Sequence, residues 1–214
     1  MKKTIVVVED HPIVRRGIVQ LINSEDGLCT VGDADSIDTA HEIISETKPN
    51  LVLIDLSLKS GNGLELIKAL TYKYPLILTL AVSLHDENVY AERVIRAGAK
   101  GYIMKSEATE NIIAAIRLVL AGGVYLSTAM QAKILNKIVS GLDSSVPEID
   151  LLSDREFEVF EMIGLGKLTK EIAEDLNLSI KTIETYKSHI KVKLNIKGYT
   201  ELIQSATEWT INSR

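Results

Sequence analysis

Five polar side chains in the first half of the chain each follow a short run of apolar, mostly β-branched residues. They are the carboxylates Glu9, Asp10 and Asp55, the hydroxyl of Ser83 and the amine of Lys105. Carboxylates that share a crevice repel one another unless a cation neutralises them, and oxygen ligands with room for water favour Mg²⁺. A magnesium-neutralised aspartate can attack a phosphoryl group, and an amine and a hydroxyl can bind the new phosphoryl oxygens. These residue types therefore predict phosphoryl transfer to an aspartate.

The elements that must position these groups alternate regularly along residues 4–121. Five short apolar runs, each followed by an amphipathic helical pattern, predict an α/β doubly wound sheet of five parallel strands with helices on both faces. The expected strands are residues 4–8, 29–31, 51–54, 76–82 and 101–104. Ligands of such sheets bind outside the carboxyl ends of the strands. One polar residue there is usually a turn, a cap or a solvated side chain, but four strand ends together favour a functional site.

Residues 1–121 resemble the receiver domain of bacterial two-component response regulators. The matching motifs are Val-Glu-Asp-His-Pro (8–12), Asp-Leu-Ser-Leu…Gly-Asn-Gly-Leu-Glu (55–65), Leu-His-Asp-Glu (84–87) and Ala-Gly-Ala-Lys-Gly-Tyr-Ile-Met-Lys (97–105). The resemblance implies a flavodoxin/CheY-like receiver domain over residues 1–122. It also implies that a sensor histidine kinase, through its phosphohistidine, or a small acyl phosphate donates the phosphoryl group.

The resemblance assigns roles to the acidic residues. Asp55 is implied to be the phosphoacceptor. Asp10 and Asp55 are implied to bind Mg²⁺ together with the backbone carbonyl of Ser57, and Glu9 to be a second acid of the pocket. Magnesium is the one cofactor expected.

The resemblance also implies a switch. Ser83 matches the switch hydroxyl, Lys105 the lysine of the pocket, and Tyr102 the aromatic residue that turns inward on activation. Two positions depart from the usual pattern: Lys59 replaces a proline four residues after the phosphoacceptor, and Ser106 follows the lysine where proline or aspartate is common. Lys59 adds a positive charge beside the pocket, but neither change removes a group that the reaction needs.

The rest of the chain differs in pattern. Residues 123–149 are expected to form a linker with a helix at 128–138, and residues 150–214 an all-α domain of four helices. Ser153 and Glu156 have the spacing of a capping box. Helical patterns at 169–176 and 180–194, separated by a short turn, have the spacing of a helix-turn-helix unit. The second helix of such a unit enters the DNA major groove.

The second of these helices carries a polar face. Within residues 181–197 the lysines are opposed by a single acid, Glu184. Lysines suit phosphates, whereas Glu184, Thr185, Lys187 and Ser188 can meet base edges. A lysine-rich face by itself is more often simply solvated. The residues predicted to bind double-stranded DNA are Lys181, Thr182, Glu184, Thr185, Lys187, Ser188 and Lys191.

Residues 151–209 resemble a LuxR-type helix-turn-helix domain. The matching motifs are Leu-Ser-Asp-Arg-Glu (152–156), Gly-x-x-Thr-Lys-Glu-Ile-Ala (166–173) and Leu-Ser-Ile-Lys-Thr-Ile-Glu-Thr (178–185). Tyr186 departs from the histidine that is usual at its position. The order of receiver, linker and LuxR-type domain is that of the NarL/FixJ group. This order implies a DNA-binding transcription regulator that forms a homodimer when phosphorylated.

Composition agrees with this interpretation. The chain has 214 residues, of which 46% are hydrophobic and 25% charged, as in globular proteins. Its apolar runs are too short to span a bilayer, no signal-peptide pattern begins the chain, and Cys29 as the one cysteine excludes an intrachain disulfide. We therefore expect a cytoplasmic protein without a membrane partner.

Two rival hypotheses remain. A phosphohydrolase of the haloacid-dehalogenase type would need an Asp-x-Asp pair after the first strand, whereas Asp55 follows the third and Ser57 stands two residues along. We therefore expect a regulator and no enzyme. The other rival is a regulator that works through protein contacts without phosphate, for which Lys59 leaves some room.

Overall fold

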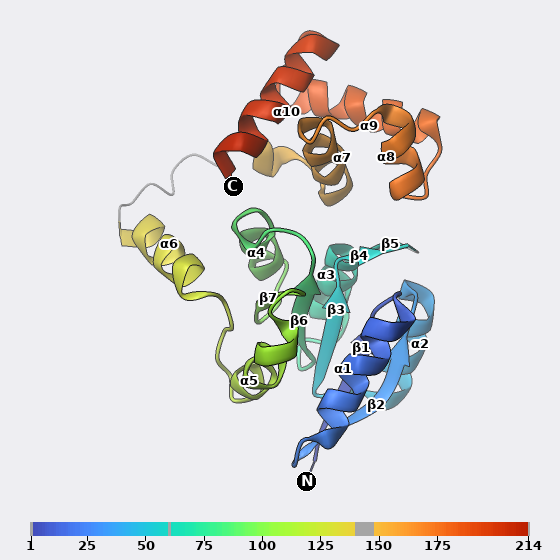
Figure 1. The fold of residues 1–214 in the computed structure, drawn as a ribbon, viewed down its shortest axis with the longest axis vertical. Coiled ribbons are helices and arrows are strands. Elements are labelled where there is room, and N and C mark those ends of the chain that lie inside the picture. Colours follow the sequence, from blue (N-terminus) through green and yellow to red (C-terminus); the bar gives the residue numbers. More distant parts are fainter. Residues whose placement is uncertain (1, 60, 140–147, 214) are drawn as a thin grey trace. The chain divides into compact units, whose positions relative to one another are not determined.

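The computed structural model describes residues 2–59, 61–139 and 148–213. The chain forms two compact units, Met1–Ala132 and Lys133–Arg214. The first is an α/β unit and the second is helical throughout its described part (Figure 1). This division of fold classes is the one that the sequence predicts.

A five-stranded parallel sheet forms the centre of the first unit (Figure 1). In spatial order its strands are β2 (Leu28–Ala34), β1 (Lys3–Val8), β3 (Leu51–Asp55), β6 (Leu78–Ser83) and β7 (Tyr102–Met104). The order confirms the doubly wound fold, with its switch point between β1 and β3. The fourth strand of the sheet begins two residues later than expected, because Leu76 is exposed before it.

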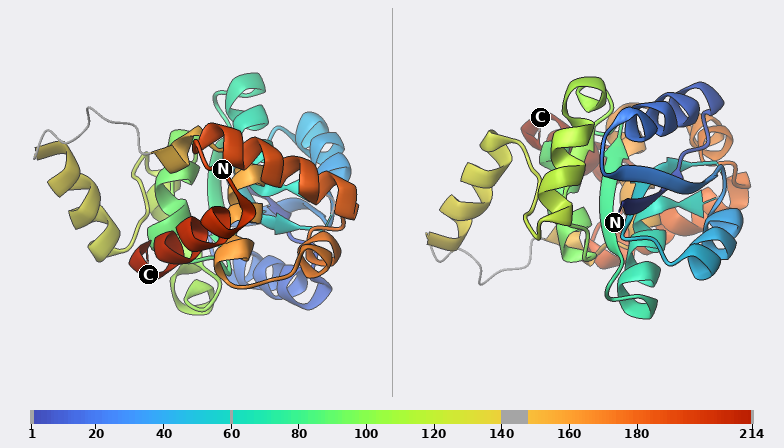
Figure 2. Two further views of the ribbon diagram at one scale, coloured as in Figure 1. Left: turned by 90° about the horizontal axis from the view of Figure 1, so that it is seen from above. Right: turned by 90° about the horizontal axis from the view of Figure 1, so that it is seen from below.

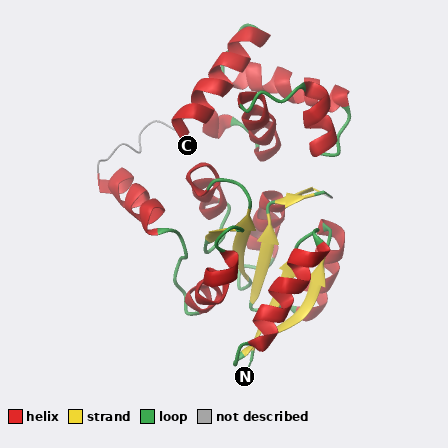
Figure 3. Ribbon diagram, viewed as in Figure 1, coloured by secondary structure: helices red, strands yellow, loops and turns green. Residues whose placement is uncertain are grey.

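Helices cover both faces of this sheet (Figures 2 and 3). On one face α1 (Pro12–Ser24) and α5 (Ala108–Leu120) pack against the strands. Each buries an apolar stripe at helical spacing, which includes Ile18, Ile22, Ile112, Ile116 and Val119. The other face is covered by α2 (Ile37–Thr47), α3 (Gly63–Lys73) and α4 (Glu87–Arg96). In a doubly wound sheet with both faces covered, a ligand binds at the carboxyl ends of the strands.

A small hairpin follows directly after Asp55 and was not predicted. It pairs β4 (Ser57–Leu58) with β5 (Gly61–Asn62) in antiparallel register. Strands of two residues carry no readable hydrophobic period, so no sequence pattern indicated the hairpin. The side chain of Asn62 then caps α3 by accepting a hydrogen bond from the Leu64 amide at 2.7 Å. The hairpin thus connects the end of β3 to a firmly anchored helix.

The first unit continues beyond residue 122, where the linker was expected to begin. The Tyr125 amide donates to the Lys100 carbonyl at 3.0 Å, and the Tyr125 carbonyl accepts from the Tyr102 amide at 2.9 Å. Leu126 and Met130 are buried. The expected helix at 128–138 is present as α6 (Thr128–Val139), while residues 140–147 lie outside the described residues. The domain limits at 122 and 150 stay predictions.

The second unit begins within α6, and after residue 147 it continues with a short 3₁₀ helix, η1 (Glu148–Leu151), and the four expected helices. These are α7 (Asp154–Gly164), α8 (Thr169–Asp175), α9 (Ile180–Lys193) and α10 (Tyr199–Ser213). The predicted capping box is confirmed at the start of α7, where the Ser153 amide donates to Glu156 Oε2 at 2.7 Å and the Glu156 amide to Ser153 Oγ at 3.4 Å. In the described part of the chain, no helix is long and apolar enough to cross a bilayer.

Candidate functional site

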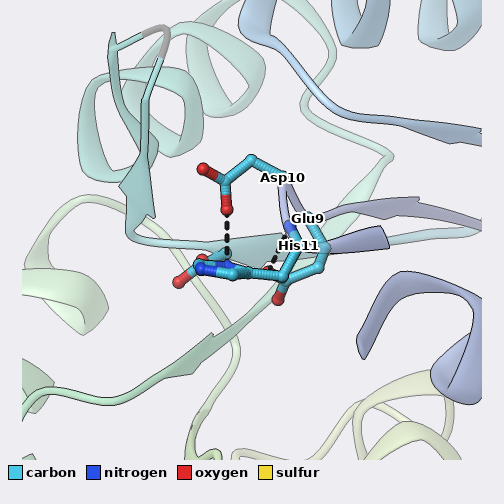
Figure 4. Close-up of side chains that lie close together, drawn as sticks. Glu9, Asp10 and His11 are labelled. Atoms are coloured by element: carbon cyan, nitrogen blue, oxygen red, sulfur yellow. Dashed lines mark hydrogen bonds and ion pairs between the residues drawn. The ribbon is translucent and has the colours of Figure 1, made fainter. Parts of the chain in front are cut away.

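The carboxyl ends of the sheet strands bring together the acidic residues that the sequence singled out. Asp55 ends β3 and is 2% exposed, and Glu9, directly after β1, is equally buried. Ligand atoms of Glu9, Asp10, His11 and Asp55 lie within 4.8 Å of one another. Figure 4 shows the His11 ring turned toward the carboxylates of its two neighbours. We call Glu9, Asp10, Asp55 and Lys105 the acid pocket.

Lys105 joins two of the three acids. Its Nζ lies 2.7 Å from Glu9 Oε2 and 2.8 Å from Asp55 Oδ2, and its side chain is 9% exposed. Burial disfavours the charged amine, but the hydrogen bonds to Asp55 and Glu9 outweigh it and raise the pKa of Lys105. Burial also raises the pKa of Asp55, against the opposing hydrogen bond and charge of Lys105. Lys105 therefore stays charged at neutral pH and holds the acceptor carboxylate.

The third acid has a different environment. Asp10 Oδ2 accepts a hydrogen bond from the Lys59 amide at 3.3 Å, and the Lys59 amine lies 3.7 Å away. Asp10 Oδ1 is buried with no hydrogen bond, although His11 Nδ1 is 2.8 Å distant. An unsatisfied buried carboxylate oxygen beside two further carboxylates is the donor set that a hard divalent cation requires. The carboxylates of the acid pocket therefore fit Mg²⁺.

Two histidines lie at this site for which the sequence pattern predicted no role. His11 Nδ1 lies 3.0 Å from Glu9 Oε1, and the His11 amide also contacts that oxygen at 3.1 Å. His85 Nε2 lies 2.8 Å from Ser57 Oγ. Neither histidine has metal-ligand spacing along the chain, so nothing in the pattern marked them. The Ser57 amide donates to Asp55 Oδ1 at 3.1 Å and fixes the acceptor from the hairpin side.

The predicted switch residues meet beside the pocket. The Ser83 side chain is buried, and its Oγ accepts a hydrogen bond from the His85 amide at 3.2 Å. Tyr102 is also buried, and its hydroxyl donates to the His85 carbonyl at 2.7 Å. The His85 ring stacks on Tyr90 of α4 with centroids 4.3 Å apart. Tyr102 therefore already lies inward, joined to Ser83 through the backbone of one loop residue.

An open, mainly apolar cavity of about 780 Å³ borders the acid pocket. Its walls come from α1, which contributes Ile18 and Leu21, and from the start of α5. His11 and Lys105 line it as well. The cavity thus provides an apolar surface directly beside the reactive carboxylates.

The second candidate site is the exposed face of α9. Ser179 caps this helix, because its Oγ accepts a hydrogen bond from the Thr182 amide at 3.1 Å. Of the residues predicted to bind DNA, four are exposed and follow one another at helical spacing: Lys181, Glu184, Thr185 and Ser188. We call these four the groove face. Thr182 and Lys191 are partly buried beside it.

The expectation that Lys187 lies on this exposed face is wrong. Its side chain is 4% exposed, and its amine donates to Thr169 Oγ1 of α8 and, at 3.0 Å, to Glu184 Oε1. Lys187 lies four residues after Ile183 and three before Ile190, so it belongs to the apolar face of the helix. This spacing was readable in the sequence, but the positive charge of the side chain concealed it.

Two protein families match the chain. The response regulator receiver domain matches residues 5–117, and the luxR family of bacterial regulatory proteins matches residues 150–206. The chain belongs to the response regulators. Its receiver unit carries the acid pocket, and its LuxR-type unit carries the groove face. The order of the two matches is that of the NarL/FixJ-type DNA-binding transcription regulators, as the sequence predicts.

Curated relatives match this response regulator over nearly its full length. Oxygen regulatory protein NreC of Staphylococcus carnosus (strain TM300) is 34% identical over 207 residues, which cover 94% of this chain and 95% of that protein. NreC of Staphylococcus epidermidis is 33% identical over 208 residues, with the same coverage. The likeness therefore spans both units and the segment between them.

Solved structures match it as well. A two-component response regulator of the LuxR family from Aurantimonas sp. SI85-9A1 is 30% identical with a TM-score of 0.60, over 65% of this chain and 99% of that one. RcsB from Salmonella enterica serovar Typhimurium, bound to promoter P1flhDC in the presence of phosphomimetic BeF3-, is 25% identical with a TM-score of 0.59. That match covers 95% of this chain and 97% of the RcsB chain.

Proposed function

We propose that this response regulator is switched by phosphorylation of Asp55 and that the switch promotes dimerisation and operator binding through α9. The observation that carries the proposal is the placement of Asp55. Its buried carboxylate ends β3 among Glu9, Asp10 and Lys105, at the switch point of the sheet. A carboxylate held there by the Lys105 amine and the Ser57 amide is fixed in place at the edge where such sheets bind their ligands.

Asp10 and Asp55, with the backbone carbonyl of Ser57, would hold Mg²⁺. When bound, the ion neutralises the acids and offsets the negative charge of the phosphoryl oxygens. Glu9 keeps one carboxylate oxygen on Lys105 and the other beside His11, so it shapes the pocket as a second acid. Asp10 Oδ1 is buried without a hydrogen bond, which supports the role of Asp10 as a ligand of the ion.

The transfer step uses groups of this chain. A carboxylate oxygen of Asp55 attacks the phosphorus, the bond from phosphorus to the imidazole nitrogen of the kinase breaks, and that nitrogen keeps the electron pair. With acetyl phosphate the bond to the acetate oxygen breaks instead. Lys105, 2.8 Å from Asp55 Oδ2, lies close enough to bind a new phosphoryl oxygen. The apolar cavity beside the pocket gives the protein that carries the phosphohistidine a surface to contact.

The switch passes through the loop after β6. The Ser83 hydroxyl would turn toward the phosphoryl group, and the His85 amide that it now accepts from would have to find another partner. Tyr102 follows the same loop, because its hydroxyl donates to the His85 carbonyl. A change at Ser83 therefore reaches α4 through the stacked rings of His85 and Tyr90.

On the DNA side, two chains related by a twofold axis would place two α9 helices on two half-sites. Pairing two modules on one duplex gives an affinity that a single, weakly charged module lacks. RcsB, with a similar fold, is bound to a promoter in its solved structure. A chain of this kind would work in the cytoplasm, as a regulator and not as an enzyme.

The test is the intact mass of the protein after incubation with acetyl phosphate, with and without Mg²⁺. We expect a Mg²⁺-dependent gain of one phosphoryl group that Asp55→Asn abolishes. Asp26→Asn, a change at an exposed aspartate of the same unit, is the matched control and should gain phosphate as the wild type does. A gain that persists in Asp55→Asn would place the acceptor elsewhere. No gain from acetyl phosphate or from the cognate kinase would favour a regulator that works through protein contacts.

A further inference from the structure

The carboxylate of Glu184 on the groove face is fixed from outside its own turn of helix. Glu184 Oε1 accepts a hydrogen bond from Thr169 Oγ1 at 3.2 Å and from the Lys187 amine at 3.0 Å. Thr169 begins α8, so the first helix of the helix-turn-helix unit holds a side chain of the second. The Glu184 side chain is nevertheless 57% exposed. It is an acceptor that faces solvent in a restricted position.

Lys187 is fully occupied in holding this position. Its amine donates to Thr169 Oγ1 and Glu184 Oε1, and it lies 3.5 Å from the Tyr199 hydroxyl. It also lies 4.7 Å from the centroid of the Tyr199 ring, within the range of a cation–π contact. An ammonium group has three donors, and three partners surround this one. Lys187 therefore has no donor left for a phosphate or a base.

The hydroxyls of the groove face use their donors on their own helix. Thr185 Oγ1 donates to the Lys181 carbonyl at 3.0 Å, and Ser188 Oγ donates to the Glu184 carbonyl at 2.9 Å. Lys181 is a long, exposed side chain that suits a phosphate better than a defined base. Among the four groove-face residues, Glu184 is thus the one whose side chain is held by a side chain of another helix, Thr169 of α8.

We propose that Glu184 reads a cytosine in the major groove, and that Lys187 and Thr169 are positioning residues for this contact. The inference rests on the proposed DNA-binding function. Cytosine presents its N4 amine as a donor, which an acceptor-only carboxylate can bind through Oε2. Guanine and thymine present acceptors that repel a carboxylate, and adenine places its N7 acceptor beside its donor. A held carboxylate penalises these bases because it cannot turn away.

The test is selection of bound DNA from random-sequence duplexes by the full chain, with acetyl phosphate and Mg²⁺ present, at low salt. We expect one position in each half-site to be enriched in cytosine, by roughly 5- to 150-fold over the other bases. Glu184→Gln should move that position toward adenine, because an amide can bind N6 and N7 together. Glu208→Gln, a change at an exposed acid of α10, is the matched control and should select the wild-type sequence.

Lys187→Met and Thr169→Val test the positioning role. Both should relax the choice at the cytosine position alone, while binding to non-specific duplex stays within about twofold. Lys187→Arg should restore the choice, because a guanidinium can still donate to the carboxylate. Circular dichroism spectra of the variants identify any that fail to fold, and Glu184→Gln, whose side chain is exposed, keeps the test decisive if Lys187→Met does fail.

The outcomes separate the two proposals. If the full chain selects no DNA and binds none at low salt, the proposed function is overturned. If it binds DNA but no half-site position favours cytosine, or if Glu184→Gln selects an unchanged sequence, only the cytosine contact is overturned. A uniform loss of affinity in Lys187→Met with the base preference retained would also contradict the positioning role.

Discussion

A buried lysine organises carboxylates in each unit of the molecule, Lys105 in the acid pocket and Lys187 beneath the groove face. Lys105 contacts Glu9 and Asp55, both buried and each from a different strand end. Lys187 contacts Glu184, three residues away on the same helix and largely exposed. Lys105 therefore pairs with acids from distant segments of the chain in the interior. Lys187 pairs with an acid of its own helix whose side chain reaches the surface.

The difference shows what each lysine is suited to do. Two buried carboxylates beside one ammonium leave excess negative charge in the pocket, and a cation and a phosphoryl group can use that charge. An exposed carboxylate beside a buried ammonium keeps its hydration, so it costs little to maintain and stays available to a partner. The arrangement around Lys105 therefore suits the binding of a cation and a phosphoryl group. The arrangement around Lys187 instead restrains the orientation of the Glu184 carboxylate, which suits recognition of a partner.

Removal of Lys105 should give the largest effect. Lys105→Met removes the ammonium group that Glu9 and Asp55 share in the interior, and we expect a loss of about 3–5 kcal/mol in the free energy of unfolding. Urea denaturation without Mg²⁺ measures this loss, and added Mg²⁺ should recover part of it. Lys100→Met, at an exposed position, should change the unfolding free energy by less than about 0.5 kcal/mol. Equal unfolding free energies of Lys105→Met and Lys100→Met would show that Lys105 does not offset the negative charge of the two buried acids.

The backbone beneath the acceptor should be nearly as sensitive. A Cβ added at Gly63 would lie 2.1 Å from the Asp55 carbonyl oxygen and 2.8 Å from the Leu56 Cα, so Gly63→Ala must move the end of β3. We expect a loss of about 2–3 kcal/mol in unfolding free energy and a lower yield of phosphoprotein. Gly17→Ala in α1 meets nothing within 4 Å, and should instead stabilise the chain by about 0.5–1 kcal/mol. Thermal unfolding of both variants measures these changes, and equal unfolding temperatures would contradict the prediction.

The sequence predicted the receiver pocket because chain topology, and not local contact, brings its residues together. Once the parallel order is known, polar residues at strand ends such as Glu9, Asp55 and Lys105 must converge. The hydrogen bonds of His11 and His85 were not predictable, because they depend on rotamers within short loops. The hairpin after Asp55 was not predictable either, since strands of two residues are too short to show a hydrophobic period.

In the second unit, caps and helix limits were readable, since they follow from local residue types. Ser153 and Ser179 both cap helices where their spacing indicates. Lys187 was misplaced because its charge received more weight than its helical position beside Ile183 and Ile190. A lysine can bury its long stem when its amine finds acceptors, and the Thr169 and Tyr199 partners come from helices that the period of α9 cannot reveal.

Glu156 offers a milder test of a buried acid, this time in the second unit. Burial opposes its charge, but hydrogen bonds from Lys193 at 2.7 Å and from Ser153 outweigh it and lower the pKa of Glu156. A lowered folded-state pKa stabilises the fold above the ordinary value of 4.5, and this stabilisation is lost as the pH falls through the folded-state value. Glu156→Gln should therefore cost about 1 kcal/mol at neutral pH.

The pH dependence provides the check on Glu156. The difference in unfolding temperature between Glu156→Gln and wild type should be constant from pH 7 to about pH 5 and shrink toward zero below the lowered pKa. Glutamine keeps the acceptor for the Ser153 amide, so the lost contribution is the charge toward Lys193 at 2.7 Å and toward His189, whose Nδ1 lies 3.5 Å from Glu156 Oε1. A difference that persists unchanged in acid would show that the ion pair does not contribute.

Lys181 should give the smallest change in stability. It is exposed on the groove face, so Lys181→Met should alter the unfolding free energy by less than about 0.5 kcal/mol. In DNA binding it should still matter, because loss of one phosphate contact reduces the slope of log affinity against log salt by about 1 for each module. Binding titrations at several salt concentrations measure this slope. An altered base preference would mean that Lys181 reads sequence, and Glu184 would then no longer be the reader that the buried Lys187 implies.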